Sequence, residues 1–460
     1  MDNQKKAHTH LTLRLSDILG PDRPHNTPIA WRNAETLTLS DLRACVKTLC
    51  RQLQATQGKR WAVCFEDSYL FTAALLALIY CGKTPVIPGH LRQKQLQEQH
   101  QQGDFDGMLT DLPLQIGTPT LWISSIVHKN ETSGTSLPLW PQDAEIVLFT
   151  SGSTGRPKAI RKPVSLLEKE SELLVRRWGN QLSGTRIAAT VTHQHLYGLT
   201  FRIFLPLAMG LPFNALLTEY HEQLQPLCST PLTLIASPAY LKRLDSTLPP
   251  LSCALIFSAG GPLEFEDARL VKQSLNALPH EIYGTSETGV IATRCQRDIG
   301  SLWKPMDGIT VHQQEDGTID VVSPLFDGDA GKTIHDLIEL HPEGFYLLGR
   351  KDRIVKIEEK RLSLTDVEQR LMALDVVRDA AVLPVTQGRR SVLAAVIVLT
   401  SPGERHRRQN GDNAVISELR QSLREWLEPV ALPRRWRIVD EIPHNAQNKR
   451  AYSELQELFL

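Results

Sequence analysis

One short stretch constrains this chain more than any other. Residues 150–158 read Thr-Ser-Gly-Ser-Thr-Gly-Arg-Pro-Lys and follow an apolar run, 146–149, that is typical of a buried strand. Glycines allow close approach of the backbone to a ligand, and hydroxyls, free N–H groups and an ammonium together suit a phosphate chain. The spacing is not that of a Walker A loop. A plain Ser/Gly turn would rarely carry so many donors, so we predict a phosphate-binding loop made by Thr150, Ser151, Gly152, Ser153, Thr154, Gly155 and Lys158.

The composition excludes several classes of protein. Lys plus Arg and Asp plus Glu balance at 51 each, so no overall field favours nucleic acid or a membrane surface. The longest apolar stretch, 70–80, is shorter than the roughly 20 residues of a membrane span and predicts a buried helix. The seven cysteines are scattered without a CxxC pair, which favours reduced thiols over disulfides or zinc. No hydrophobic signal core follows the N-terminus. We expect a cytoplasmic protein.

Apolar runs and amphipathic stretches alternate through the first three quarters of the chain. This pattern predicts an α/β fold, a large N-terminal domain of mostly parallel sheets flanked by helices. Ligands in such folds lie outside the carboxyl ends of strands. The predicted strands are 61–65, 85–89, 108–110, 121–123, 146–149, 186–191, 232–236, 254–258 and 281–283, and the helices are 40–57 (capped by Ser40), 68–81, 93–102 and 165–177.

After Asp336 the pattern changes to that of a small α+β domain. We expect hairpin-like strands at 345–348 and 354–357, further strands at 380–384, 392–398 and 435–439, and helices at 363–374 and 415–426. The predicted domains are 1–349 and 350–460. The basic clusters 405–408 and 434–437 are interpreted as solvated loops, with docking of an acidic acyl carrier protein as the alternative.

A second polar motif follows the strand at 281–283. It reads Tyr283-Gly284-Thr285-Ser286-Glu287, and a glycine pair, Gly260-Gly261, follows the strand before it. By itself the motif could be a strand ending in a polar turn. With the phosphate loop it resembles the signatures of the adenylate-forming superfamily, which contains acyl- and aryl-CoA synthetases, adenylation domains and luciferases. Ser286 stands where that family usually has threonine.

The resemblance implies that the chain uses ATP and Mg²⁺. It places Tyr283 beside the adenine, in a pocket shaped by the loop with Gly260 and Gly261. Thr285 and Ser286 would face the α-phosphate. Glu287 would hold the magnesium, for which a carboxylate oxygen is a suitable ligand.

Three further matches involve the nucleotide sugar and the hinge. Asp336 stands where the family has an aspartate that binds both ribose hydroxyls, although His335 replaces the glycine before it. The stretch 349–352 resembles the family's Gly-Arg-x-Asp motif. It makes Arg350 a ribose contact and Asp352 the hinge of a mobile small domain.

The remaining matches concern catalysis. The stretch 443–449 resembles the C-terminal signature of the family, with Asn448 in place of glycine, and makes Lys449 the catalytic lysine. Thr150 and Glu287 join it in the catalytic set. His195 stands where the family often has a histidine in the acyl-pocket wall, with His193 as the rival. Glu359 stands at a glycine position of the family's thiol-tunnel loop, where a glutamate would crowd or repel a phosphopantetheine arm or reshape its path.

The implied activity is ATP-dependent conversion of a small carboxylic acid, aromatic or acyl, to acyl-AMP with release of pyrophosphate. Transfer to coenzyme A or to the phosphopantetheine of an acyl carrier protein would follow. The compact chain resembles, within the family, the AMP ligases of aryl-polyene clusters. Two alternatives stay open: a non-catalytic acyl-nucleotide-binding protein and a luciferase-like oxygenase acting on an adenylate.

Overall fold

The structure is a computed structural model. It describes residues 12–123, 137–150, 158–261, 263–315, 318–326, 331–350, 353–357, 360–387, 390–424, 426–427, 429–444 and 450–460. The chain divides into two compact units, Met1–Thr310 with Val322–Gly331 and Val311–Val321 with Lys332–Leu460. The domain division predicted after residue 349 falls inside the second of these units and stays a prediction from the sequence.

The first unit contains a six-stranded sheet in the order β6-β5-β3-β4-β7-β8. Its pairings are parallel except for the last, where β8 runs antiparallel to β7. The strands are β3 (Arg60–Cys64), β4 (Thr84–Ile87), β5 (Gly107–Thr110), β6 (Thr120–Trp122), β7 (Glu145–Thr150) and β8 (Lys158–Pro163).

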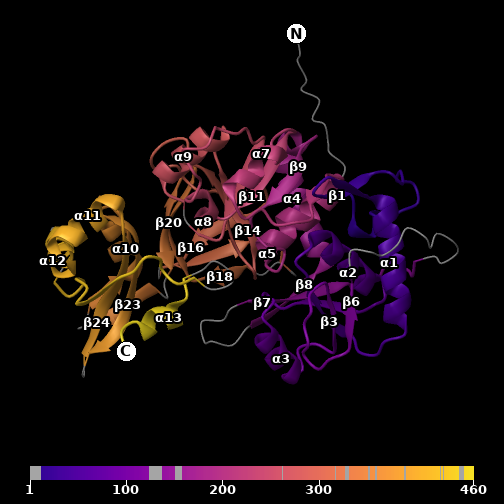
Figure 1. Ribbon diagram of the computed structural model, residues 1–460, viewed down its shortest axis with the longest axis horizontal. Helices are drawn as coiled ribbons and strands as arrows, with labels where there is room; N and C mark the ends of the chain where they lie inside the picture. Colours follow the sequence, from indigo (N-terminus) through magenta and orange to yellow (C-terminus); the bar gives the residue numbers. More distant parts are fainter. Residues whose placement is uncertain are drawn as a thin grey trace, which may run out of the picture. The chain divides into compact units, whose positions relative to one another are not determined.

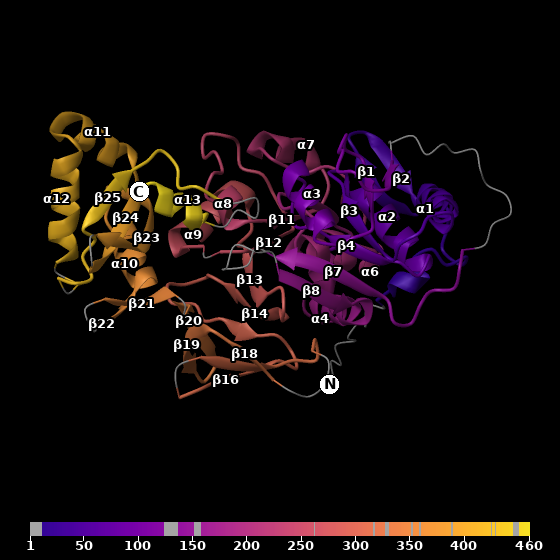
Figure 2. The same cartoon turned by 90° about the horizontal axis from the view of Figure 1, so that it is seen from below.

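Helices cover both faces of this sheet, as the alternating pattern predicts. The flanking helices are α1 (Leu39–Gln54), α2 (Ser68–Tyr80) and α3 (Gln93–Gln101). Every residue of α2 is buried, which confirms the buried helix. Leu96 of α3 packs with Ala62 and Cys64 of β3. In both views β3 lies between α3 and the pair α1 and α2 (Figures 1 and 2).

The start of α1 differs from the prediction. Ser40 is not its cap; the cap is Thr38, whose hydroxyl accepts from the backbone N–H of Asp41 while the Asp41 carboxylate accepts from the Thr38 N–H. This reciprocal capping box satisfies two N–H groups at once. A single serine hydroxyl two residues later would satisfy only one of them.

The second sheet of the first unit has nine strands in the order β15-β14-β13-β12-β11-β9-β10-β1-β2. Its central strands are parallel and its outer strands antiparallel, which confirms the mostly parallel α/β expectation. The strands are β1 (Pro28–Arg32), β2 (Glu35–Thr38), β9 (Arg186–Ala189), β10 (Phe213–Asn214), β11 (Leu232–Ala236), β12 (Leu255–Ala259), β13 (His280–Thr285), β14 (Gly289–Cys295) and β15 (Lys304–Pro305).

Short helices and one long helix connect these strands. Helix α4 buries the leucine-rich face that its periodicity predicts, and it extends past the expected end at 177. The helices are α4 (Val164–Leu182), α5 (Leu196–Gly198), α6 (Leu205–Met209), α7 (Leu224–Leu227), α8 (Pro238–Leu241) and α9 (Phe265–Leu275), with short 3-10 turns at Leu15–Asp17 and His221–Gln223 and a π-helical turn at Leu199–Phe204.

The second unit is built on small antiparallel sheets and a three-stranded sheet. Helices α10 and α12 cover one face of the three-stranded sheet and α13 covers the other (Figure 2). The strands are β16 (Thr310–Gln313), β17 (Ile319–Val322), β18 (Lys332–Ile334), β19 (Asp336–His341), β20 (Gly344–Arg350), β21 (Ile354–Ile357), β22 (Lys360–Ser363), β23 (Val377–Gln387), β24 (Arg390–Leu399) and β25 (Arg435–Ile438), and the helices are α10 (Leu364–Met372), α11 (Ser401–Asn410), α12 (Asp412–Leu423) and α13 (Tyr452–Glu457).

One expectation about this unit is confirmed and another is wrong. The strands at 345–348 and 354–357 each belong to an antiparallel pair of neighbouring strands, β20 with β19 and β21 with β22, as the hairpin-like pattern predicts. The basic clusters are not loops: residues 405–408 lie within α11, and 435–437 lie within β25. In β25, Trp436 is buried between Arg435 and Arg437, because successive side chains of a strand point to opposite faces.

None of the described helices combines the length and apolarity that crossing a membrane requires. All seven cysteines are free thiols, and Cys45, Cys50, Cys64 and Cys253 are buried.

His280 at the start of β13 gives the first unit a specific sensitivity to acid. Its ring lies 5.7 Å from that of Trp178, and burial, with the charges of Arg177 and Arg297, lowers its pKa to about 4. The unfolded chain has a histidine pKa of about 6.5, so it gains a proton at a higher pH than the folded chain. This contribution to stability is present above pH 6.5 and is lost as the pH falls from about 6.5 to about 4, by up to about 3 kcal/mol.

Replacing the His280 ring should therefore make the stability of the folded chain depend less on pH between about 6.5 and 4. We expect His280→Phe to lose less thermal stability than the native chain between pH 7 and pH 4.5, since phenylalanine keeps the aromatic packing and cannot take up a proton. The measurement is the midpoint of thermal unfolding at both pH values. Parallel losses in the two proteins would show that His280 does not contribute.

Candidate active site

The predicted phosphate loop connects two neighbouring antiparallel strands. Thr150 ends β7, Lys158 begins β8, and the two residues pair directly across the strands. The Thr150 hydroxyl donates to the Lys158 carbonyl over 3.5 Å. The residues between them, among them the predicted Ser151, Gly152, Ser153, Thr154 and Gly155, lie outside the described residues. The two ends of the signature are therefore held side by side at one edge of the six-stranded sheet.

The second motif forms the turn between β13 and β14. The Thr288 hydroxyl accepts from the Thr285 N–H at 3.0 Å, and the Thr285 hydroxyl accepts from the Thr288 N–H at 3.2 Å. A Cβ on Gly284 would lie 2.1 Å from the carbonyl oxygen of Gly289, so no larger residue fits there. We refer to residues 285–289 as the Glu287 turn. Ser286, half-buried, lies within it.

The two motifs meet although 129 residues separate them. The Lys158 ammonium lies 3.1 Å from the Glu287 carboxylate, and the Lys162 ammonium donates to the Glu287 carbonyl at 3.2 Å. Lys158 and Lys162 lie on the same face of β8 because side chains alternate along a strand. The structure thus joins the phosphate-loop lysine to the predicted metal ligand.

Glu287 has the properties of a magnesium ligand. Burial acts to raise its pKa, but the hydrogen bond from Lys158 and its positive charge outweigh that effect, so the pKa of Glu287 lies below its ordinary value. The group is therefore ionised near neutral pH. Among the described residues, no group of three or more His, Cys, Asp or Glu side chains is arranged to hold a metal ion. Magnesium commonly binds through one or two carboxylates with substrate phosphates and water, and Glu287 fits that arrangement.

The predicted adenine site is held together by a buried carboxylate. Tyr283 is buried, with its ring centre 5.8 Å from that of Trp303. A Cβ on Gly260 would meet nothing within 4 Å, so the loop after β12 borders open space, as a site for a flat ring requires. Glu281 ties this loop to the sheet, because its carboxylate accepts from the Leu263 N–H and from three side-chain N–H groups of Arg294 and Gln296.

The structure separates the two candidate histidines. His193 is buried, and its two ring nitrogens lie 2.8 Å from the Ser68 hydroxyl and 3.0 Å from the Phe65 carbonyl oxygen. Its ring is therefore occupied within the core. His195 is half-buried, and its Cε1 atom would lie 3.6 Å from a Cβ on Gly89, a position that also contacts the Phe149 carbonyl. His195 thus lies near Gly89 and the end of β7.

In the second unit, two predicted ribose contacts stand opposite each other. Asp336 is buried at the start of β19 and pairs in register with Arg350 at the end of β20. The predicted hinge Asp352, the tunnel residue Glu359 and the catalytic Lys449 lie outside the described residues.

A buried carboxylate links the residues that follow the hinge and the lysine. Glu368 accepts from Arg353, one residue after Asp352, and pairs with Arg450, one residue after Lys449, at 3.1 Å. The Val382 N–H also donates to Glu368 at 2.7 Å. The two segments that carry the predicted hinge and the predicted lysine therefore share one anchor in the second unit.

The sequence analysis missed two charged residues near Glu287. Glu170 lies on α4 and Lys162 on β8, and both are buried. The signal was present: Glu170 occupies the helix face made by Leu166, Leu167, Leu173 and Leu174, which the periodicity predicts to be buried. A charged residue at such a position requires a partner, but the sequence does not show which residue that is.

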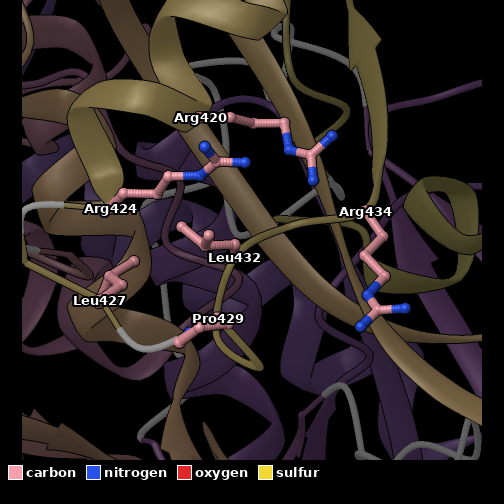
Figure 3. A pocket seen from close by; sticks show the side chains of 6 residues that line it. All are labelled: Arg420, Arg424, Leu427, Pro429, Leu432 and Arg434. Atoms are coloured by element: carbon pink, nitrogen blue, oxygen red, sulfur yellow. The ribbon is translucent and has the colours of Figure 1, made fainter.

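A separate hollow lies in the second unit, and none of the predicted catalytic or nucleotide-binding residues lines it. Its volume is about 730 Å³, and three arginines and three apolar residues line it. Figure 3 shows Arg420 and Arg424 extending from the end of α12, with Arg434 on the other side. The Nε of Arg420 is buried without a hydrogen-bond partner in the described part of the chain. The concentration of like charge favours an anionic ligand.

Comparison with known proteins gives consistent matches over most of the chain. The profile of the family described as AMP-binding enzyme matches residues 20–329, and that of the AMP-binding enzyme C-terminal domain matches residues 366–449. The 4-coumarate–CoA ligase of Halorhodospira halophila is 30% identical over 316 residues, covering 66% of this chain and 74% of that protein.

Solved structures share the fold. ATP-bound MatB from Rhodopseudomonas palustris aligns with a TM-score of 0.81 at 18% identity, over 97% of this chain and 99% of that one. The o-succinylbenzoate CoA synthetase MenE from Bacillus subtilis, in complex with its acyl-adenylate intermediate, aligns with a TM-score of 0.75 at 19% identity, over 94% and 95%. At 18% and 19% sequence identity, this similarity establishes a shared fold and nothing more.

Proposed function

The chain belongs to the AMP-binding enzyme family, and from that premise we propose that it activates a carboxylic acid with ATP and passes the acyl group to a thiol. In the first step a carboxylate oxygen attacks the α-phosphorus of ATP. The bond to the β-phosphate oxygen breaks, pyrophosphate leaves, and an acyl-AMP mixed anhydride remains. In the second step a thiolate attacks the acyl carbon, a thioester forms, and AMP leaves.

The observation that carries this proposal is the contact between Lys158 and Glu287. It brings the predicted phosphate-binding lysine, on β8, within 3.1 Å of an ionised carboxylate in the turn between β13 and β14. A site that splits ATP at its α-phosphate needs both, because charge builds on the phosphoryl oxygens and the leaving pyrophosphate. Lys158 would bind the phosphate chain, and Glu287 would hold Mg²⁺, which would supply additional positive charge to the phosphates.

Other residues would orient the reactants. Tyr283 and the loop with Gly260 and Gly261 would hold the adenine, Asp336 and Arg350 the ribose, and Lys449 would neutralise charge between the carboxylate and the α-phosphate. Thr150, Thr285 and Ser286 would contribute hydroxyl donors to the phosphates, and His195 would line the acid site. The small domain would then turn at Asp352 to admit the thiol.

We propose an aromatic or acyl acid as substrate. The support is the name of the matched Halorhodospira halophila relative, a 4-coumarate–CoA ligase. Assignment to the AMP ligases of aryl-polyene clusters, with a carrier protein as acceptor, rests on the sequence resemblance. The three-arginine hollow suits any acceptor with negative charge, which includes the phosphates of coenzyme A and an acidic carrier protein alike. Reduced thiols such as the seven free cysteines fit a cytoplasmic location.

The test is a pyrophosphate-release screen over aromatic and aliphatic acids, with coenzyme A and an acyl carrier protein supplied in parallel. We expect acid-dependent release with at least one acid and thioester formation with one of the two thiols. ATP binding without release for any acid would instead select a non-catalytic nucleotide-binding protein. Oxygen consumption dependent on the acyl-adenylate would select an oxygenase.

A further inference from the structure

A buried pair of opposite charges, Lys162 and Glu170, lies beside the Glu287 turn and has no part in the chemistry described above. Lys162 is 5% exposed and Glu170 is 3% exposed. Burial raises the pKa of Glu170, and the positive charge of Lys162 opposes that rise. Isolated charges are costly inside a protein, so each of these residues needs the charge of the other.

Each member of the pair holds one backbone group of the same turn. The Lys162 ammonium donates to the Glu287 carbonyl at 3.2 Å, and the Val290 N–H donates to the Glu170 carboxylate at 2.7 Å. Gly289 lies between these two contacts with a φ of +71°, and a Cβ there would come within 2.7 Å of the Glu170 carboxylate. The backbone is therefore held on both sides of Thr288 and packed directly against Glu170.

The pair also connects this turn to the other parts of the candidate site. Lys162 shares β8 with Lys158, which contacts the Glu287 carboxylate itself. The second oxygen of Glu170 accepts from the Thr200 hydroxyl at 3.1 Å, in the π-helical turn that follows His195. The hydrogen bonds between Thr285 and Thr288 already close the turn. The additional buried hydrogen bonds from Lys162 and to Glu170 are therefore not needed merely to form it.

We propose that Lys162 and Glu170 are positioning residues that set the place of the Glu287 carboxylate and thereby the affinity for magnesium–ATP. The inference rests on the proposed function, because it takes Glu287 as the metal ligand. The physical reason is that a carboxylate binds a metal ion most tightly when neighbouring residues hold it in the correct position. Loss of such outer support typically lowers metal affinity by about 10- to 100-fold.

The test measures binding, so it does not require a known acid. In Lys162→Met, which keeps an apolar chain and removes the ammonium, the Mg²⁺ concentration that gives half-maximal tightening of ATP binding should rise about tenfold. Calorimetric titration of ATP over a series of MgCl₂ concentrations provides the value. The exposed Lys169→Met on α4 is the matched control and should leave it unchanged.

Two further variants separate positioning from general damage. In a Glu287→Gln background, Lys162→Met should cause no additional rise, because the carboxylate that it positions is absent. An equal rise in both backgrounds would overturn the proposal. The double variant Lys162→Met with Glu170→Gln leaves no unpaired buried charge and should fold if the single variant does not. It should still show the raised Mg²⁺ requirement; native magnesium dependence in it would also overturn the proposal.

Failure of the proposed function would look different. If Mg²⁺ tightens ATP binding to the native chain but no acid leads to pyrophosphate release, the acid-activating role is wrong. The binding experiment still decides the role of Lys162 and Glu170 in that case. If the native chain turns over an acid and Lys162→Met keeps its magnesium dependence, the role of the pair is wrong and the function stands.

Discussion

Replacing Lys449 by alanine should lower carboxylate-dependent exchange of pyrophosphate into ATP by about 10²- to 10³-fold, the loss typical of removing one donor that stabilises transition-state charge. A carboxylate and an α-phosphate repel each other until their charges are neutralised. An ammonium between them acts most strongly when the new bond forms. The loss should therefore appear in the rate at saturating ATP rather than in ATP affinity.

Lys449 lies outside the described residues, but the residues on either side of the segment 445–449 are fixed in the structure. His444 and Arg450 form an antiparallel bridge, and the Ala451 N–H donates to the Pro443 carbonyl at 2.9 Å, so the ends of the segment 445–449 are closed. Arg450 is fixed by Glu368 at 3.1 Å and Asp379 at 2.8 Å.

The controls separate the two half-reactions. When acyl-AMP is added directly, Lys449→Ala should retain most of its thioester formation. The charge that Lys449 neutralises, between the free carboxylate and the α-phosphate of ATP, is no longer present at that stage. Lys94→Ala, at an exposed position of α3, should leave exchange unchanged. Exchange at the native rate in Lys449→Ala would remove this residue from its proposed role.

The second large effect should come from Glu287. In Glu287→Gln the first step should fall about 100-fold at low Mg²⁺, because an amide is a much weaker ligand for this hard cation than a carboxylate. The variant also leaves the Lys158 ammonium without its partner at 3.1 Å, so ATP binding in the absence of metal should be kept or tightened. The measurement is exchange rate against MgCl₂ concentration.

This combination distinguishes a metal ligand from a structural residue. Raising the Mg²⁺ concentration should recover part of the activity of Glu287→Gln. The exchange rate of Glu287→Asp should lie between those of the native chain and Glu287→Gln. Because Glu287 is half-exposed at a turn, its loss should change the thermal midpoint little. A loss of exchange that is the same at every Mg²⁺ concentration would contradict the assignment.

How much the sequence predicts depends on the distance over which each signal acts. The strand before the phosphate loop, the buried helix Ser68–Tyr80 and the strand His280–Thr285 were predictable because their signals are contiguous. The pairing of β8 with β7 was not predicted. The charged residues of β8 obscure the alternating polar and apolar pattern of a strand, and β7, with which it pairs, lies on the other side of the phosphate loop in the sequence.

Side-chain partnerships between distant segments were beyond the sequence. His193 and His195 differ by two positions, and only packing against Ser68 and Phe65 assigns the first to the core. Lys162 looks like an ordinary surface charge along the chain, and the apolar helix face around Glu170 does not identify its partner. They become partners because β8, α4 and the Glu287 turn meet, a juxtaposition that arises from the whole arrangement of two sheets.

The sequence by itself determined the family, the fold class and the chemical types gathered for ATP: a hydroxyl- and glycine-rich loop, a carboxylate and lysines. These follow from local patterns, since glycine positions, capping groups and apolar periods act over a few residues. The tertiary structure alone decided that Lys158 meets Glu287 and that two buried residues of opposite charge, Lys162 and Glu170, hold the Glu287 turn. Such contacts join residues 120 to 129 positions apart, and only the packing of separate strands and helices brings them within hydrogen-bond distance.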